Sequence, residues 1–359
     1  MKKILLNMYL KKNLGDDLFL KIFAERYSNS KLYILPLCNY NKKYLNKNII
    51  QKRNLITRTF NFLDKKIGRN KAIVFNHYKK KSDILVTLGG SMFIQKNDNI
   101  NEYKNKIENT YYRVKKPYYI IGSNFGPYKD DRYYRLYKNV FTSAKDVCFR
   151  EEYSFKLFSD LRKTRYKSDI VFSLNTNNYK IEDSKKIVIS VIDLSNRNDI
   201  SKYKNEYQNK IIEIIKYYQN KNYNISLMSF CDGEGDNIAI QEILEKIDNK
   251  NNITYFNYNG DIDMALNEIS SCEMIVATRF HAMILGFVFN KKVLPIIYSK
   301  KMLNVIKDSK FDGIYVDISD IEKFDIKNDY KNISKMNKNM EKLKKSAEEQ
   351  FKELDKVLL

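Results

Sequence analysis

The residues best suited to chemistry lie in one segment, where Arg279 and His281 stand between two apolar runs. The run before them is typical of a buried strand, and the run after them, Ala282 to Phe289, of a buried helix. The pair therefore falls at the beginning of the expected helix, where backbone N–H groups and the helix dipole favour an anion. The Arg279 guanidinium adds a planar fork suited to a carboxylate or phosphate. His281, with an ordinary pKa of about 6.5, can transfer a proton.

The same segment also has a purely structural interpretation. A partly buried histidine satisfied by a backbone carbonyl, beside an arginine on the surface, fits this sequence equally well. The segment by itself does not decide between the two. The other histidine, His77, stands among lysines and is expected on the surface.

A second arginine, Arg150, repeats the arrangement in the first half of the chain. It ends the expected strand "DVCFR", and Ser154 stands just inside the helix that follows. An arginine at the carboxyl end of a strand faces the ligand-binding edge of a doubly wound sheet. The alternative is a surface ion pair with Glu151 or Glu152, which contributes little to stability.

Glycines gather at the carboxyl ends of the expected strands. Gly15 follows the first strand, Gly89 and Gly90 end "LVTLGG", and Gly122 ends "YYIIG". Glycine at this edge lets the backbone approach an anion and direct N–H groups at it. Together with polar neighbours, they form the candidate backbone and acceptor side of a cleft: Asn13, Gly15, Gly89, Gly90, Ser91, Gly122 and Ser123.

Short apolar runs alternate with amphipathic segments along most of the chain, including a run over 169–174 that predicts a strand. This alternation predicts an α/β fold with parallel sheets covered on both faces. The polar stretch 175–186 interrupts the pattern, which then restarts, so we expect two domains over 1–178 and 186–328. In 329–359 apolar residues recur at spacings of three and four, which predicts a long amphipathic helix. That helix either packs back across the domains, pairs with another chain or lies on a membrane.

The composition limits the class of partner and the compartment. The 359 residues include 65 Lys and Arg against 43 Asp and Glu, a formal charge of +22. Such a surplus either attracts polyanions, including nucleic acid and anionic membranes, or is a solvated surface. The four cysteines form no CxxC pair, so neither a metal site nor a redox pair is expected, and we place them in the core of a protein in a reducing compartment. They are Cys38, Cys148, Cys231 and Cys272.

The amino-terminal run has no small-residue cleavage site, and no apolar run reaches the ~20 residues that span a bilayer. We therefore expect a cytoplasmic protein, either free or peripheral at the inner face of the plasma membrane.

Several motifs together carry a family resemblance. They are "NLGDDLF", "LVTLGGSMF", "IGSNFGP", "FREEYSFKLF", "SDIVFSL", "MSFCDGEGD" and above all "TRFHAMILGFVFNKKVLPIIYSKK". In this order they resemble a polysaccharide pyruvyl transferase from Asn13 to about Lys301. Ser91 stands where that family often has a third glycine, and Glu151 where it often has an aspartate, which bears on the fine geometry of the site.

The resemblance implies a glycosyltransferase-B-like fold, in which two Rossmann-like domains face a central cleft. The amino-terminal domain would be the acceptor side and the carboxyl-terminal domain the donor side. The donor implied is phosphoenolpyruvate and the acceptor a pair of sugar hydroxyls, in a polysaccharide or its lipid-linked precursor. No metal, cofactor or nicotinamide is implied. The implied donor-binding residues are Arg150, Arg279, Phe280 and His281.

The chemistry of ketal formation agrees with these residue types. Protonation of the donor's terminal methylene carbon requires a general acid, for which His281 is the candidate. Two cations neutralise the donor and help phosphate to leave. Asp16 either accepts a proton from the acceptor hydroxyl or caps the first helix. We expect His281→Ala and Arg279→Ala to abolish turnover and to leave the protein folded.

Two other function classes remain open at this stage. A nucleotide-sugar glycosyltransferase uses the same two-domain architecture, with Glu273 and Asp261 as available acids. A basic, non-catalytic module could bind nucleic acid or anionic lipid, but no nucleic-acid-binding motif is present and the lysines are scattered. We therefore expect no nucleic-acid partner. A lipid-linked acceptor would lie at the anionic cytoplasmic leaflet and favour loose contact with it.

Overall fold

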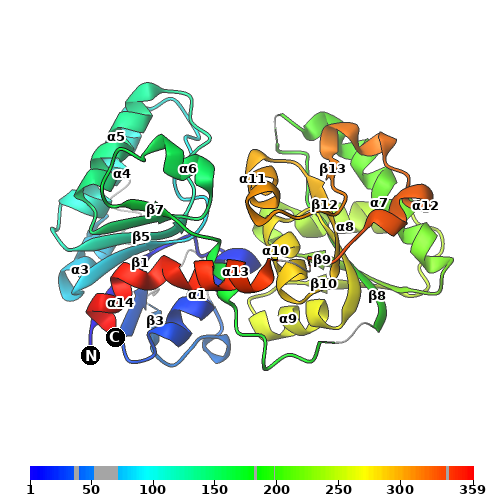
Figure 1. Ribbon diagram of the computed structural model, residues 1–359, viewed down its shortest axis with the longest axis horizontal. Coiled ribbons are helices and arrows are strands. Elements are labelled where there is room, and N and C mark those ends of the chain that lie inside the picture. Colours follow the sequence, from blue (N-terminus) through cyan, green and yellow to red (C-terminus); the bar gives the residue numbers. More distant parts are fainter. Residues whose placement is uncertain (36–39, 52–71, 182–183, 198, 337–338) are drawn as a thin grey trace. The chain divides into compact units, whose positions relative to one another are not determined.

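The computed structural model describes residues 1–35, 40–51, 72–181, 184–197, 199–336 and 339–359. These residues form two compact units, each with a parallel sheet and flanking helices (Figure 1). The first unit contains Met1–Lys11, Phe19–Ile170 and Lys345–Leu359, and the second contains Lys12–Leu18 and Val171–Lys344. The chain thus enters the second unit briefly before it builds most of the first.

The first unit is built on seven parallel strands in the order β3-β2-β1-β4-β5-β6-β7. β1, β4, β5 and β6 are nearly continuous runs of buried residues, as expected for strands covered on both faces. The strands are β1 (Lys3–Asn7), β2 (Lys31–Ile34), β3 (Ile49–Gln51), β4 (Ile84–Leu88), β5 (Tyr118–Ser123), β6 (Asp146–Phe149) and β7 (Thr164–Tyr166).

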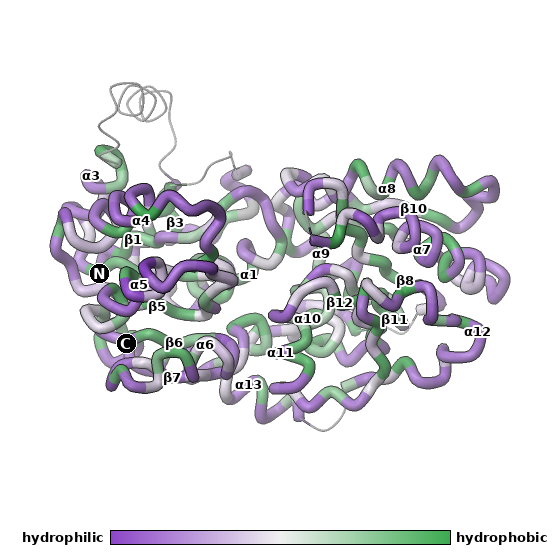
Figure 2. Tube along the Cα trace, turned by 90° about the horizontal axis from the view of Figure 1, so that it is seen from above, coloured by the Kyte–Doolittle hydropathy of each residue, from purple (hydrophilic) through white to green (hydrophobic). Residues whose placement is uncertain are grey.

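The helices of the first unit bury an aromatic-rich core against this sheet. Phe125, Tyr133, Phe141 and Phe158 are buried there, and their rings pack mostly edge to face. Figure 2 shows α5 mostly in hydrophilic colours, whereas the sheet strands are mostly hydrophobic. The helices are α1 (Leu14–Arg26, which begins in the second unit), α3 (Ile73–Lys81), α4 (Ile100–Ile107), the π-helical turn η2 (Glu108–Tyr112), α5 (Asp131–Ser143), α6 (Glu152–Leu157), and the 3₁₀ turns η1 (Lys42–Tyr44) and η3 (Ile170–Ser173).

The second unit repeats this topology with six parallel strands in the order β10-β9-β8-β11-β12-β13. The strands are β8 (Ser184–Ser190), β9 (Asn224–Ser229), β10 (Ile253–Asn257), β11 (Cys272–Ala277), β12 (Lys292–Ile297) and β13 (Val316–Asp317). The helices and 3₁₀ turns after β8 are η4 (Ser201–Tyr203), α7 (Lys204–Gln219), η5 (Asp232–Glu234), α8 (Asp236–Glu245), α9 (Ile262–Ser270), α10 (Phe280–Val288), α11 (Lys300–Ser309), η6 (Ile318–Lys323), α12 (Ile326–Asp329) and η7 (Tyr330–Asn332).

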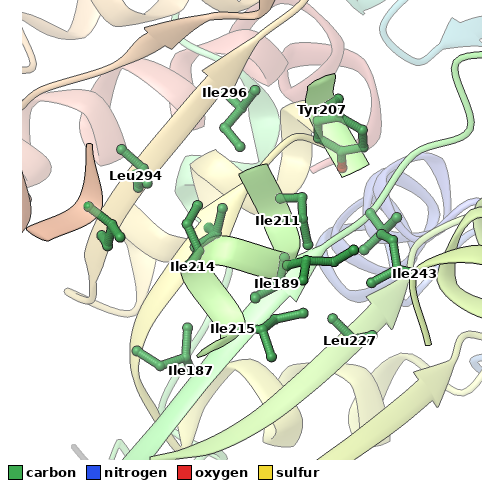
Figure 3. Close-up of a cluster of buried hydrophobic side chains, with 14 of the residues drawn as sticks. Ile187, Ile189, Tyr207, Ile211, Ile214, Ile215, Leu227, Ile243, Leu294 and Ile296 are labelled. Atoms are coloured by element: carbon green, nitrogen blue, oxygen red, sulfur yellow. The ribbon is translucent and has the colours of Figure 1, made fainter. Parts of the chain in front are cut away.

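The core of the second unit forms where α7 lies on the sheet. Ile211, Ile214 and Ile215 of α7 recur at helical spacing and are buried against Ile189 of β8 and Leu227 of β9 (Figure 3). The helical spacing predicted from the sequence therefore identifies the face of α7 that packs against the sheet.

Both sheets have the strand order of a doubly wound Rossmann-like domain, which confirms the predicted fold class. In such sheets ligands bind at the carboxyl edge, beside the point where the strand order reverses. That point lies between β1 and β4 in the first unit and between β8 and β11 in the second. Among the described residues, no helix is both long and apolar enough to cross a membrane.

Three local predictions differ from the structure. The run 169–174 is not a strand but contains the 3₁₀ turn Ile170–Ser173, and the last strand of the sheet is β7, which precedes it. The single long helix predicted over 329–359 is divided into α13 (Met340–Glu348), the 3₁₀ turn η8 (Glu349–Phe351) and α14 (Lys352–Leu358). The units also divide differently from the predicted ranges, after Ile170 rather than 178, and the last fifteen residues return to the first unit.

The predicted cysteine positions are described for three of the four residues. Cys148, Cys231 and Cys272 are buried and free. Cys38 lies outside the described residues.

Candidate functional site

In the second unit, the turn between β11 and α10 carries the predicted pair Arg279 and His281. The Ser190 hydroxyl, at the end of β8, accepts hydrogen bonds from the N–H groups of Thr278 (3.0 Å) and Arg279 (3.1 Å). The Thr278 hydroxyl contacts the Tyr207 hydroxyl at 3.1 Å. The turn is therefore fixed to the neighbouring strand at the switch point of the sheet.

The Arg279 guanidinium is buried and binds two carboxylates. Nε donates to Asp236 at 3.1 Å, Nη2 donates to the same carboxylate, and Nη1 donates to Glu234. Asp236 also accepts the N–H groups of Phe230 and Cys231, both at 2.9 Å. Burial lowers the pKa of Arg279, but the two carboxylates outweigh it, so the pKa lies well above its ordinary value. The fork predicted for a ligand is held by the protein's own acids.

Further cations surround this ion pair. Arg197 donates to Glu234 at 3.3 Å, and its guanidinium carbon lies 5.1 Å from the centre of the Tyr298 ring. The Lys301 ammonium lies 5.5 Å from the centre of the Phe280 ring. Burial raises the pKa of Tyr298, but Lys301, Arg279 and Arg197 outweigh it and lower the pKa below its ordinary value. The three cations therefore favour negative charge at Tyr298.

His281 is half-buried and lies directly against Gly15. A β-carbon on Gly15 would lie 1.7 Å from His281 Nδ1, far inside any tolerable contact. Asn13 holds this approach, because its side chain accepts the N–H of Gly15 at 3.1 Å and contacts Glu234 at 3.4 Å. The N–H of Leu14 also donates to the Phe230 carbonyl at 3.0 Å. Asn13 and Gly15, predicted for the amino-terminal domain, thus belong to the second unit and position His281.

Asp16 lies in the first turn of α1 in the same unit and is half-buried. The predicted alternative role as helix cap falls instead to Asn13, whose side chain accepts an N–H of the first turn. The neighbouring Asp17 is buried and accepts a hydrogen bond from the Tyr258 hydroxyl at 2.6 Å. The turn therefore carries two acids, the half-buried Asp16 and the buried Asp17.

In the first unit, Arg150 follows β6 and is buried. Its Nη1 donates to Asp169 at 3.0 Å, and Nη2 donates to Asn124 at 2.7 Å and Ser91 at 3.5 Å. A β-carbon on Gly90 would lie 2.4 Å from Nη1, so the guanidinium lies flat against that glycine. Arg150 is therefore not a surface residue, and the buried Asp169 is one of its partners.

The remaining predicted residues of the first unit lie at the ends of β4 and β5. The Ser123 hydroxyl donates to the Gly89 carbonyl at 2.6 Å, and the Ser91 hydroxyl contacts Asn124 at 3.3 Å. Gly122 has a φ of 73° and leaves no room for a side chain, because Ile170 would lie 2.5 Å from its β-carbon. Its N–H donates to the side chain of Gln350 at 3.1 Å.

Comparison with known proteins connects these features to a family. The model of the polysaccharide pyruvyl transferase family matches residues 13–300, which contain both arginines, His281 and the glycine turns. The chain belongs to this family. A comparison with curated proteins gives no match.

Solved structures that resemble this family member share its fold at low identity. The S. aureus MnaA structure with UDP has a TM-score of 0.61 at 12% identity and covers 99% of this chain and 95% of its own. Anabaena Alr3699/HepE with UDP-glucose has a TM-score of 0.58 at 11% identity and covers 100% and 98%. The UDP-GlcNAc 2-epimerase from Methanocaldococcus jannaschii has a TM-score of 0.54 at 11% identity and covers 99% and 99%. The two domains are thus of the glycosyltransferase-B type.

Sequence reasoning did not find several residues of this pyruvyl transferase family member that hold the arginines. Asp236 and Glu234 stand in the motif "MSFCDGEGD", whose acids were visible but had no assigned partner. The other residues missed were Arg197, Tyr298 and Lys301 around Arg279, and Asn124, Asp169 and Gln350 around Arg150. The described residues contain no group of three or more His, Cys, Asp or Glu side chains suited to a metal ion.

Proposed function

We propose that this protein transfers a pyruvyl group from phosphoenolpyruvate to two hydroxyls of a sugar and forms a cyclic ketal. The observation that supports this most directly is the position of His281. In a member of the pyruvyl transferase family, this titratable ring lies against Gly15 at the carboxyl edge of a Rossmann-like sheet, on a turn that has Lys301 and Arg197 near it.

The reaction takes up one proton at the donor's methylene carbon and releases two protons from the sugar hydroxyls. Protonated His281 gives its proton to the terminal methylene carbon of the donor, which becomes a methyl group, and positive character develops at the adjacent carbon. One sugar hydroxyl bonds to that carbon and loses a proton, for which Asp16 is the acceptor. The second hydroxyl then displaces phosphate and loses its proton. Of the two hydroxyl protons, one restores His281 and the other leaves with the phosphate, so that Asp16 is again a carboxylate.

The donor's negative charge is matched by cations near Arg279. Because the Arg279 fork is bound by Asp236 and Glu234, we infer that it contributes charge and fixes the turn. Lys301 and Arg197 are the cations beside it that extend the positive field. Arg150, in the first unit, is proposed as a further donor ligand, with Asp169 and Asn124 setting its orientation.

The acceptor is proposed to be a sugar of a polysaccharide or of its lipid-linked precursor. Phosphoenolpyruvate is a cytoplasmic metabolite, so the reaction is proposed to take place in the cytoplasm, and contact with the anionic membrane face would serve a lipid-linked acceptor. Salt-reversible binding to anionic vesicles tests this contact. Absence of binding at low ionic strength would contradict it.

A pair of histidine variants tests the proposed function. Phosphate release and pyruvylated product are measured with phosphoenolpyruvate and a panel of glycan acceptors. His281→Gln should reduce the rate by about 10²–10⁴-fold. His77→Gln, which changes an exposed histidine, is the matched control and should retain the wild-type rate. Near-wild-type release by His281→Gln would remove this residue from the role of general acid.

A thermal-shift comparison tests the donor itself. Phosphoenolpyruvate should raise the unfolding temperature of the wild-type protein, whereas UDP-glucose should not, since a ligand that binds the folded state stabilises it. Stabilisation by UDP-glucose alone would favour a nucleotide-sugar glycosyltransferase.

A further inference from the structure

The last residues of the chain complete the first unit. Lys345–Leu359 belong to this unit although they follow the whole of the second, and they lie beyond the residues 13–300 that the family model matches. Gln350, in the turn η8 between α13 and α14, is a polar residue with an exposed fraction of 0%. Full burial of an uncharged amide requires that its donors and its acceptor all find partners.

The Gln350 amide is bonded to three strand ends. Its Oε1 accepts the N–H of Gly122 in β5 at 3.1 Å. Its Nε2 lies within hydrogen-bond distance of three carbonyl oxygens, those of Phe149 (3.2 Å), Lys167 (2.9 Å) and Ser168 (3.0 Å). Phe149 ends β6, and Lys167 and Ser168 follow β7. One side chain thus joins the carboxyl ends of three neighbouring strands.

Two of these carbonyl groups belong to the peptide bonds that introduce the buried ion pair. The Phe149 carbonyl forms the peptide bond to Arg150, and the Ser168 carbonyl forms the peptide bond to Asp169. Arg150 and Asp169 meet through Nη1 at 3.0 Å. The backbone of both partners of the ion pair is therefore fixed to the same amide, one residue away from each side chain.

The rest of the carboxyl-terminal segment holds Gln350 in place. The Ser346 hydroxyl accepts the N–H of Ser168 at 3.0 Å, and Arg165 donates to the carbonyl groups of Glu349 and Gln350. Farther along, Arg26 forms a two-pronged ion pair with Asp355 at 2.9 and 2.6 Å. The Ser346 and Arg165 contacts flank Gln350 directly and fix its backbone, whereas the Arg26–Asp355 ion pair fixes the chain farther along.

We propose that Gln350 is a positioning residue for donor binding: it sets the backbone of Arg150 and Asp169, and thereby the direction of the Arg150 guanidinium. This rests on the proposed function in one respect, the role of Arg150 in binding phosphoenolpyruvate. The carboxyl-terminal segment is then part of the first unit's binding apparatus rather than an appendage to the family's common core.

The choice of glutamine follows from what the strand ends present. They offer one N–H group and three carbonyl groups, and one amide serves them with its oxygen and its two N–H bonds, one of which is shared between two carbonyls. Glutamate would bring a negative charge against three carbonyl oxygens, and asparagine is one methylene too short to span the same groups. Methionine keeps the volume but removes every hydrogen bond, which makes it the informative substitution.

The test compares phosphoenolpyruvate affinity in single and double variants by titration calorimetry. Gln350→Met should weaken binding by about tenfold, because a shift of the guanidinium by a fraction of an ångström lengthens its charged hydrogen bonds. Arg150→Met should weaken binding by about 100-fold or more. In the Arg150→Met background, Gln350→Met should have no further effect. Asp355→Asn is the matched control, since it weakens the ion pair at the far end of the segment but changes no contact of Gln350 or of the strand ends, and it should bind as the wild type does.

The possible failures are distinguishable. If Arg150→Met weakens binding but Gln350→Met does not, or if the two effects multiply in the double variant, the positioning role is overturned and the donor assignment stands. If the wild-type protein does not bind phosphoenolpyruvate, or Arg150→Met binds it normally, the donor role of Arg150 fails and the positioning role for the donor fails with it.

A second measurement does not depend on the ligand. In hydrogen exchange followed by mass spectrometry, Gln350→Met should speed exchange in peptides covering 147–152 and 166–171, whereas Asp355→Asn should not. Equal exchange in the wild type and in Gln350→Met would contradict the structural part of the proposal. If Gln350→Met does not fold, Ser346→Ala replaces it in both measurements, because this variant removes only the bond to Ser168. A smaller loss of affinity is then expected. Unchanged affinity in Ser346→Ala would overturn the proposal.

Discussion

His281 Nδ1 occupies the space that a side chain at position 15 would need. A β-carbon on Gly15 would lie 1.7 Å from this nitrogen, so only glycine fits there. The glycine and the histidine are 266 positions apart in the sequence and belong to the same compact unit. The glycine of the first helical turn is therefore required by the histidine and not by its own backbone conformation. Removing this space should displace the imidazole ring while the rest of the unit remains packed.

Gly15→Ala should therefore reduce phosphate release from phosphoenolpyruvate by about 100-fold, since small displacements of a catalytic group are costly. Stability should fall by only about 1–3 kcal/mol, as is usual when an added methyl group forces a local shift. Steady-state kinetics and urea unfolding measure the two effects. Gly233→Ala is the control, because a β-carbon there meets no atom within 4 Å. Normal turnover by Gly15→Ala would show that His281 does not need its present position.

Gly90→Ala should act on Arg150 in the first unit. Its β-carbon would lie 2.4 Å from Nη1, and the guanidinium cannot move away freely because Asp169 and Asn124 hold it. We expect phosphoenolpyruvate affinity to fall by about tenfold or more, because the loss of a hydrogen bond from a charged donor costs roughly 1.5–3 kcal/mol. Titration calorimetry measures this. Unchanged affinity would show that Arg150 does not bind the donor through its present orientation.

Arg279→Met should destabilise the protein, in contrast to the sequence-based expectation that removal of this arginine leaves the fold intact. Without the guanidinium, the buried Asp236 loses its cation, and breaking one side of a buried ion pair typically costs about 3–5 kcal/mol. Urea unfolding is measured for Arg279→Met, for Asp236→Asn and for the double variant. The double variant should lose less unfolding free energy than the sum of the two single losses. Additive effects would mean that the two side chains do not stabilise each other.

The local parts of this structure could be predicted from the sequence, whereas most of the partners could not. The spacing of Ile211, Ile214 and Ile215 is local, so it shows both the helix and its buried face. The partners of the two arginines could not be found in the same way. Asp236 and Asp169 reach them only because parallel strands bring distant loops to one edge, and no periodicity records that meeting.

Two features show why domain ranges were harder to predict than elements. The polar stretch 175–186 marked a boundary by composition, but Lys12–Leu18 carries no such mark and still belongs to the second unit. In the same way, the apolar stripe of the carboxyl-terminal segment predicted a helix that packs on the protein. It could not show that Gln350, a polar residue within that segment, would be bonded to three strands of the first unit.

Lys79 should make stability rise with pH on the alkaline side of neutrality. This α3 residue is fully buried, and its ammonium group donates to the carbonyl groups of Thr110 and Tyr111 in the π-helical turn η2. Burial lowers its pKa to about 8, and the nearby Glu108 offsets only part of that effect.

Between this pKa and the ordinary pKa of a lysine in the unfolded chain, the unfolded state holds the proton and the folded state does not. The free energy of unfolding therefore increases with pH by about 1.4 kcal/mol per unit in this window. Urea unfolding of the wild-type protein and of Lys79→Met, between about pH 7.5 and 10, measures the difference, which should change by about 2 kcal/mol over this range. Other groups titrate alike in both proteins, so the wild type should gain on the variant as pH rises, and a constant difference would show that Lys79 keeps its proton in the folded state.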